Sequence, residues 1–168
     1  PTYEKVRPNG SLGPAYIVGA LRKHGIEANY LDATVGESGK DLNESFYLRS
    51  EMENGNIRCG ISSNELAEIF TQYDIIATSS SFTVQTRMHF EIAKVAKMVE
   101  KQMARPLLTV TGGVNSRSLK EHFLSNNFDI VVLGDGERTI VQIAEQFSSG
   151  NPDYSKVERI AFRKNHKK

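Results

Sequence analysis

The strongest constraint on this chain is a repeated pattern of an apolar run, a short loop rich in glycine or serine, and a helical segment. The apolar runs cover residues 74–78, 107–111 and 130–133, and each resembles a strand buried on both faces. Strands that alternate with helices predict a parallel sheet with helices on both faces. Because such crossovers are right-handed, all three loops should lie at one edge of the sheet.

These three loops are built mainly from small residues. Those that follow the runs are Ser79, Ser81, Thr83, Gly112, Gly113, Gly134 and Gly136. Ligands of open parallel sheets bind beyond the carboxyl ends of the strands, where glycine permits close approach and hydroxyl groups supply hydrogen bonds. We therefore predict one binding surface for a large, flat ligand. Each loop also has a plainer interpretation, as a tight turn or as the start of the next helix.

The remaining pattern predicts a single α/β domain over residues 1–168. Helices are expected over residues 12–24, 45–52, 84–103, 118–125 and 138–147, and strands over 27–31 and 157–163. A further helix should begin at Ser62, which has a capping-box spacing to Glu65. No apolar run precedes residue 12, although a βα repeat begins with a strand. The expected fold is flavodoxin-like (Rossmann-like), a parallel sheet with helices on both faces, its first strand missing or truncated.

Composition excludes several classes of protein. Twenty-one basic and twenty acidic residues leave a formal charge of +1, which does not favour a nucleic-acid partner. Cys59 is the only cysteine, so an internal disulfide, a CxxC redox pair and a cysteine-ligated cluster are excluded. No apolar stretch is long enough to cross a bilayer and no signal peptide is present, so we expect a cytoplasmic protein with no membrane partner.

Familiar catalytic and nucleotide-binding motifs are absent. There is no GxxxxGK[ST] phosphate loop, and the Gly134–Gly136 loop lacks the third glycine of a dinucleotide fingerprint. No Ser-His-Asp or Cys-His spacing supports nucleophilic catalysis. The histidines are His24, His89, His122 and His166, and none falls on a strand-end loop. The sequence therefore predicts no catalytic residue and no metal ligand.

Taken in order, the segments resemble the cobalamin-binding domain of cobalamin-dependent radical S-adenosylmethionine enzymes, which lies ahead of the catalytic domain. This family includes the magnesium-protoporphyrin IX monomethyl ester cyclases and various methylases (methyltransferases). The segments that carry the resemblance are residues 12–17, 20–25, 30–33, 74–85, 111–113 and 129–137. Together they extend over nearly the whole chain.

The resemblance implies that cobalamin binds in the base-off form at the carboxyl edge of the sheet. Ser79 takes the serine role beside the nucleotide tail, Ser81 replaces a leucine, and Gly112 with Gly113 supplies the glycine pair. Asn9 and Gly10 are further candidates in the first loop. The family's DxHxxG signature is absent, since residues 2–13 contain no histidine, so we expect no protein histidine on the cobalt.

The resemblance also implies a partner, the radical S-adenosylmethionine domain of a parent chain. That domain holds the iron–sulfur cluster and S-adenosylmethionine in a CxxxCxxC motif, which a chain with one cysteine lacks. Two alternatives stay open. The domain has lost its cofactor and serves in docking or substrate gating, or it is a separate flavin or nucleotide protein of flavodoxin type. The second is disfavoured because residues 7–11 lack a Ser/Thr-rich phosphate loop.

Overall fold

The computed structural model describes residues 11–34, 49–51, 55 and 57–163. Its centre is a four-stranded sheet with the order β3-β4-β5-β6. The strands are β3 (Ile75–Ser79), β4 (Leu108–Gly112), β5 (Ile130–Val132) and β6 (Ile160–Phe162). β3, β4 and β5 are parallel, whereas β6 is antiparallel to β5. The protein is therefore an α/β fold with a mixed, mostly parallel open sheet, and the expectation of a wholly parallel sheet is wrong at β6.

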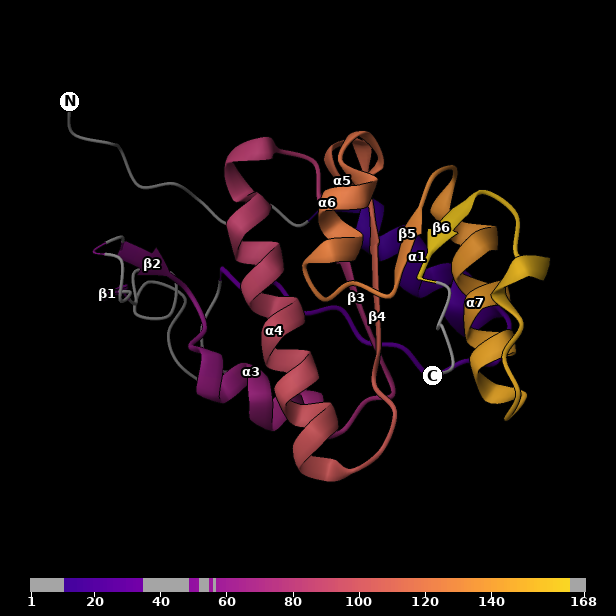
Figure 1. Cartoon of the computed structure of the whole chain (residues 1–168), viewed down its shortest axis with the longest axis horizontal. Helices are drawn as coiled ribbons and strands as arrows, with labels where there is room; N and C mark the ends of the chain where they lie inside the picture. The colour runs from indigo at the N-terminus through magenta and orange to yellow at the C-terminus, as the bar shows by residue number, and fades with distance from the viewer. Residues whose placement is uncertain (1–10, 35–48, 52–54, 56, 164–168) are drawn as a thin grey trace.

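Helices flank both faces of this sheet (Figure 1). On one face lie α1 (Leu12–Lys23) and α7 (Gly136–Ser148), which pack with β4 and β5 in one apolar cluster. On the other face lie α3 (Ser63–Phe70), α4 (Thr86–Met103) and α6 (Lys120–Ser125). The short helix α5 (Val114–Ser118) follows β4 directly, and there are two 3-10 turns, η1 (Thr83–Gln85) and η2 (Tyr154–Lys156).

Burial along the strands explains why continuous apolar runs predicted them. All three residues of β5 are buried, as are the first four of β4, so both faces of these strands are covered. The three strands expected from the apolar runs are confirmed within a residue at either end. The expected helices at 12–24, 84–103, 118–125 and 138–147 are also present, with η1 and α5 as additional turns.

A capping box begins α3, as its spacing predicted. The Ser62 amide donates to a Glu65 carboxylate oxygen at 2.6 Å, and the Glu65 amide donates to Ser62 Oγ at 3.2 Å. Two amides that would lack intrahelical partners are thus satisfied by side chains. Leu66 and Phe70 on the buried side of α3 then pack against α4. This contact fixes α3 over the β3 side of the sheet.

Two expected elements are wrong. Residues 27–31 form no strand and pair with none of the strands in the described part of the chain. The helix expected over 45–52 is contradicted at residues 49–51, where β1 (Arg49–Glu51) pairs antiparallel with β2 (Ile57–Cys59). Residues 45–48 and 52 lie outside the described residues. Cys59 is the last residue of β2 in this small ribbon, shortly before the N-cap of α3.

The end of the sheet opposite the predicted binding loops is closed by a polar network. Asp129 accepts hydrogen bonds at Oδ2 from the Thr109 amide, the Thr109 hydroxyl and Lys97 Nζ, at 2.9, 2.8 and 2.7 Å. These bonds join α4, β4 and the residue that precedes β5. No helix among the described residues has the length and apolarity to span a membrane.

Candidate functional site

The loops after β3, β4 and β5 lie at the same edge of the sheet. In the parallel register Ser79 is opposite Gly112, and Thr111 is opposite Val131. The residues that follow these three strands are therefore side by side, with the loop before α7 next to the loop before α5. We call this region, formed by residues 79–86, 112–115 and 133–137, the carboxyl rim. Figure 1 shows it at the top of the molecule.

The predicted site residues on the carboxyl rim differ in exposure. Ser79, Ser81, Thr83 and Gly113 are exposed, whereas Gly112, Gly134 and Gly136 are partly buried. The hydroxyl groups after β3 are therefore accessible to a ligand. Asn9 and Gly10 lie outside the described residues.

A buried residue between the two exposed serines joins the loops after β3 and β4. Ser80 is fully buried, and its amide donates to the Gly112 carbonyl at 2.7 Å. Its carbonyl accepts from the Asn115 amide at 3.1 Å, and its hydroxyl accepts from Asn115 Nδ2 at 2.9 Å. Asn115 Nδ2 also donates to Thr86 Oγ1 at 2.8 Å, which connects α4 to the same set. We call Ser80, Asn115 and Thr86, with the Gly112–Gly113 backbone, the rim interlock.

Gly113 is required by the rim interlock itself. Its φ is +102° and its ψ is 168°, a region that side-chain-bearing residues almost never adopt. A Cβ at this position would lie 2.5 Å from the Ser80 carbonyl oxygen and 2.9 Å from the Ser80 carbonyl carbon. The close approach that this glycine permits is therefore made by the protein's own loop after β3.

Protein atoms also occupy the space beside the other rim glycines. A Cβ on Gly136 would meet Ile17 Cδ1 of α1 at 2.6 Å, and one on Gly134 would meet Arg159 Cδ at 2.7 Å. Gly112 differs, because a Cβ there would make an ordinary contact of 3.6 Å with Val132 Cβ. Three of the four rim glycines thus have a packing role within the chain.

Sequence reasoning overlooked the apolar side chains of the rim. Phe82, Val84 and Val114 are 64%, 92% and 62% exposed, and they flank the accessible hydroxyl groups. An exposed apolar patch often marks a binding surface. A signal was available, because Phe82 and Val84 precede the first full turn of α4 and do not belong to its apolar stripe. Ser80 was not among the predicted site residues, although it is the residue buried between the exposed Ser79 and Ser81.

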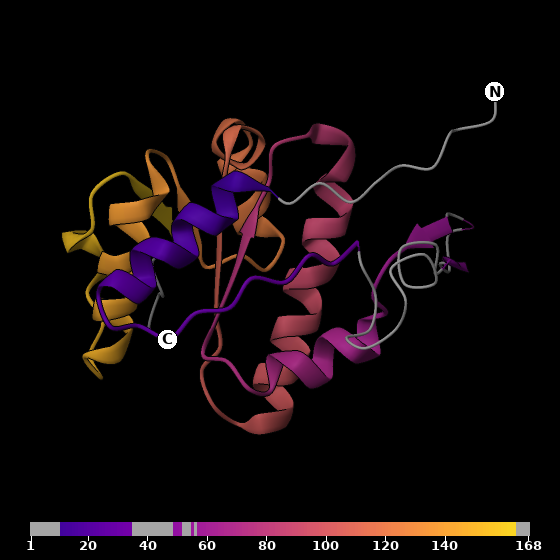
Figure 2. The ribbon, with the colours of Figure 1, turned by 180° about the vertical axis from the view of Figure 1, so that it is seen from behind.

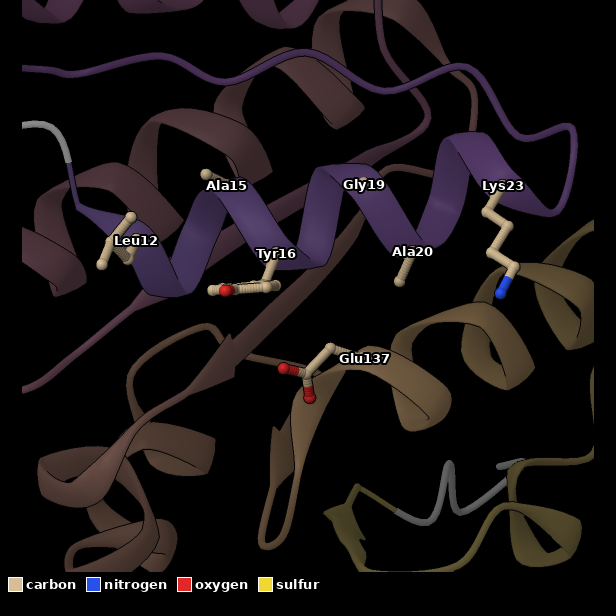
Figure 3. A pocket seen from close by; sticks show the side chains of 7 residues that line it. All are labelled: Leu12, Ala15, Tyr16, Gly19, Ala20, Lys23 and Glu137. Atoms are coloured by element: carbon tan, nitrogen blue, oxygen red, sulfur yellow. The ribbon is translucent and has the colours of Figure 1, made fainter.

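A shallow groove of about 410 Å³ lies between α1 and α7 and reaches the carboxyl rim. Its lining residues are Leu12, Ala15, Tyr16, Gly19, Ala20, Lys23 and Glu137. Figure 3 shows Tyr16 and Ala20 directed toward the α7 side, where Glu137 lies at the first turn. The walls of the groove are mostly apolar. The exposed side chains of Leu12 and Tyr16 form part of them.

The carboxyl rim contains no histidine or cysteine, and its ionisable side chains are the exposed carboxylates of Asp135 and Glu137. Among the described residues, no group of three or more His, Cys, Asp or Glu side chains could hold a metal ion. The buried imidazole of His89 lies in α4, its Nδ1 has no hydrogen-bond partner, and burial lowers its pKa. Besides these carboxylates, the rim offers hydroxyl groups, backbone polar groups and apolar contact. It can bind and orient a ligand.

No protein-family model matches this chain, and no curated protein sequence matches it.

Proposed function

We propose that this domain is a cobalamin-binding module whose carboxyl rim receives the corrin ring of the cofactor. One arrangement carries the proposal: the register places Ser79 opposite Gly112, so that accessible hydroxyls, backbone groups and exposed apolar side chains share one edge. A corrin is a wide, flat ring with apolar faces and a rim of amide side chains. Phe82, Val84 and Val114 suit its face, and the hydroxyls of the loop after β3 suit its amides.

The rim interlock affects how the nucleotide tail of cobalamin would enter. The space beside Gly113 is taken by the Ser80 backbone, so a tail that entered between β3 and β4 would first have to separate these loops. We therefore infer that the corrin rests on the rim above Ser80, base-off, and without a protein histidine on the cobalt. The tail would then follow the groove between α1 and α7, which opens at Glu137.

The proposal includes a fold and a partner. We infer that the sheet is the flavodoxin-like one with its first strand absent from the described residues. The corrin would present its outer face to a radical S-adenosylmethionine domain, the cyclase or methyltransferase that the sequence resemblance implies. We expect the domain itself to supply no reacting group.

The test is retention of cobalamin by the purified chain. After incubation with hydroxocobalamin and gel filtration, we expect corrin absorbance to elute with the protein at a ratio near one to one. The cobalt(II) form should give a base-off electron paramagnetic resonance spectrum without nitrogen superhyperfine splitting. Ser81→Trp, on the rim, should weaken retention at least tenfold, whereas Gln72→Trp, exposed before β3 at the opposite end of the sheet, should not. Equal retention by both variants would contradict the site.

The second candidate is a docking module without cofactor, favoured by the protein atoms that occupy the space beside Gly113, Gly134 and Gly136. In that case the exposed side chains of Phe82, Val84 and Val114 would contact another protein domain. A folded chain that retains no corrin at micromolar hydroxocobalamin would exclude the cobalamin-binding module and support the docking module. Unchanged far-ultraviolet circular dichroism would verify that the chain is folded.

A further inference from the structure

The imidazole of His89 is buried without its full set of hydrogen bonds. The residue is 9% exposed, and its Nδ1 is the one buried side-chain nitrogen or oxygen of the described residues that has no partner. Buried polar atoms in folded proteins are almost always paired, because an unpaired one retains the cost of its lost hydration. An exception at a buried titratable group therefore calls for an explanation in terms of what that group does.

His89 lies directly next to the rim interlock along α4. Thr86 precedes it by one helical turn on the same buried side of the helix. Thr86 Oγ1 accepts from Asn115 Nδ2 at 2.8 Å, which is the contact that connects α4 to the loop after β4. The His89 ring also packs against Phe123 of α6, with the ring centroids 6.3 Å apart. Figures 1 and 2 both show the first turns of α4 next to α5 and α6.

No charged group around His89 compensates for a second proton on its ring. The ionisable residues of the helices packed around it are Arg117 of α5 and Lys120, Glu121 and His122 of α6. Lys120 pairs with Glu121 at 3.2 Å, whereas Arg117 and His122 are exposed. The residues one turn away on α4 are Gln85, Thr86, Ile92 and Ala93, and none of them is ionisable. Burial alone lowers the pKa of His89, so the closed structure favours the neutral ring.

The first turn of α4 is held less firmly than the second half of the helix. The N-cap residue Gln85 makes no side-chain hydrogen bond to the helix, and the three residues of η1 that precede α4 are exposed. Farther along, Val95 and Val99 are buried in the cluster with α3, and Lys97 Nζ donates to Asp129 at 2.7 Å. Local opening of a structure begins where buried contacts are few. The start of α4 can therefore move while the rest of the helix stays in place.

We propose that His89 is a proton-sensitive switch of the carboxyl rim, whose protonation moves the start of α4 away from α6 and releases Thr86 from Asn115. An imidazolium ring has N–H donors at both nitrogens, and the buried Nδ1 faces no acceptor in the closed arrangement. Movement of this turn would bring water to Nδ1. Because Thr86 lies on the same turn, the movement would also remove the support of the interlock from α4.

The consequence is an opening between the loops after β3 and β4. In the closed rim, the Ser80 hydroxyl and Thr86 Oγ1 share the amide of Asn115, and the Ser80 backbone covers Gly113. Without Thr86, the contact between the two loops depends on Ser80 and Asn115 alone. Acid would therefore expose a part of the rim that is covered at neutral pH. This switch does not depend on which ligand the rim binds.

The expected size of the effect follows from proton linkage. An exposed imidazole titrates near pH 6.5, whereas the buried ring of the closed rim stays neutral to lower pH. Between pH 7.5 and pH 5.5 the open rim thus binds a proton that the closed rim resists. The ratio of open to closed molecules should increase about five- to tenfold over this range as the pH falls.

Hydrogen exchange of individual amides, followed by nuclear magnetic resonance without denaturant, tests the switch. The reporters are the amides of Ser80 and Asn115, which donate to the carbonyls of Gly112 and Ser80. After correction for the intrinsic exchange rate, we expect their protection to fall about five- to tenfold from pH 7.5 to pH 5.5. It should also stay well below that of the Val131 amide in the fully buried strand β5. His89→Leu should abolish the pH response, whereas His122→Leu, an exposed histidine of α6, should retain it.

Two results would overturn the proposal. Equal protection of Ser80, Asn115 and Val131 at both pH values would show that the rim opens only when the whole domain unfolds. A pH response that persists in His89→Leu would assign it to another group. If His89→Leu does not fold, the unmodified chain gives the answer, because the ring nitrogens of His89 and the amides of Ser80 and Asn115 should then titrate with one midpoint. Separate midpoints would equally contradict the switch.

Discussion

Substitution of Gly113 by alanine separates packing of the rim from any role in ligand binding. The new Cβ would lie 2.5 Å from the Ser80 carbonyl oxygen, which is part of the backbone and cannot rotate away. The backbone conformation, with φ at +102°, adds strain of about 1–3 kcal/mol for a residue other than glycine. Separation of the loops would also weaken the buried bonds of Ser80 to Gly112 and Asn115, at a cost of about 1–3 kcal/mol.

The expected loss in the free energy of unfolding is therefore about 3 kcal/mol or more, a large fraction of the stability of an ordinary domain. Gly112→Ala is the matched control on the adjacent residue. Its Cβ would meet Val132 Cβ at 3.6 Å, an ordinary contact, so we expect a change of about 1 kcal/mol at most. Urea unfolding followed by far-ultraviolet circular dichroism measures both. If Gly113→Ala lost no more stability than Gly112→Ala, the rim interlock would not explain why glycine occupies position 113.

Two further perturbations address polar groups that are buried or partly buried. Burial lowers the pKa of His89 below its ordinary 6.5, so as the pH falls below that value the unfolded chain binds a proton that the folded chain resists. The free energy of unfolding should thus decrease from about pH 7 to about pH 5, and His89→Leu should flatten this slope in urea titrations; an unchanged slope would assign it to other groups. Asp129→Ala removes the acceptor of three hydrogen bonds from Thr109 and Lys97 and should cost about 2–3 kcal/mol. Asp74→Ala is the control, because the Asp74 carboxylate is mostly exposed although it pairs with Arg105, and its loss should lower the free energy of unfolding by about 1 kcal/mol or less. Similar losses of stability for Asp129→Ala and Asp74→Ala would contradict the structural role of the Asp129 network.

Local sequence patterns predicted the elements whose structure is decided locally or by simple burial. The runs at residues 107–111 and 130–133 are largely apolar because both faces of β4 and β5 are covered, and no partner had to be identified to recognise them. The capping box of α3 needs only Ser62 and Glu65, which lie within one turn of each other.

The failures share a dependence on a partner distant in sequence. Residues 27–31 have β character, but a strand exists only where another strand accepts its hydrogen bonds, and no described strand pairs with them. At the rim, the sequence pointed to Ser79 and Ser81 because their hydroxyls follow a strand. The contact of Ser80 with Asn115 spans 35 positions and becomes visible only when β3 and β4 are side by side. The close approach that Gly113 permits is made by the Ser80 backbone of the same chain, which no local pattern around residue 113 indicates.

The rim interlock also has a thermodynamic consequence for any guest molecule. Loops that hold each other through Ser80, Asn115 and Thr86 have already lost their conformational freedom when the chain folds. A ligand that binds to the carboxyl rim would contact a backbone that is already ordered, so ordering of the backbone would cost little free energy on binding. The affinity of the ligand would instead depend on the exposed side chains of the rim, of which Phe82 is the largest.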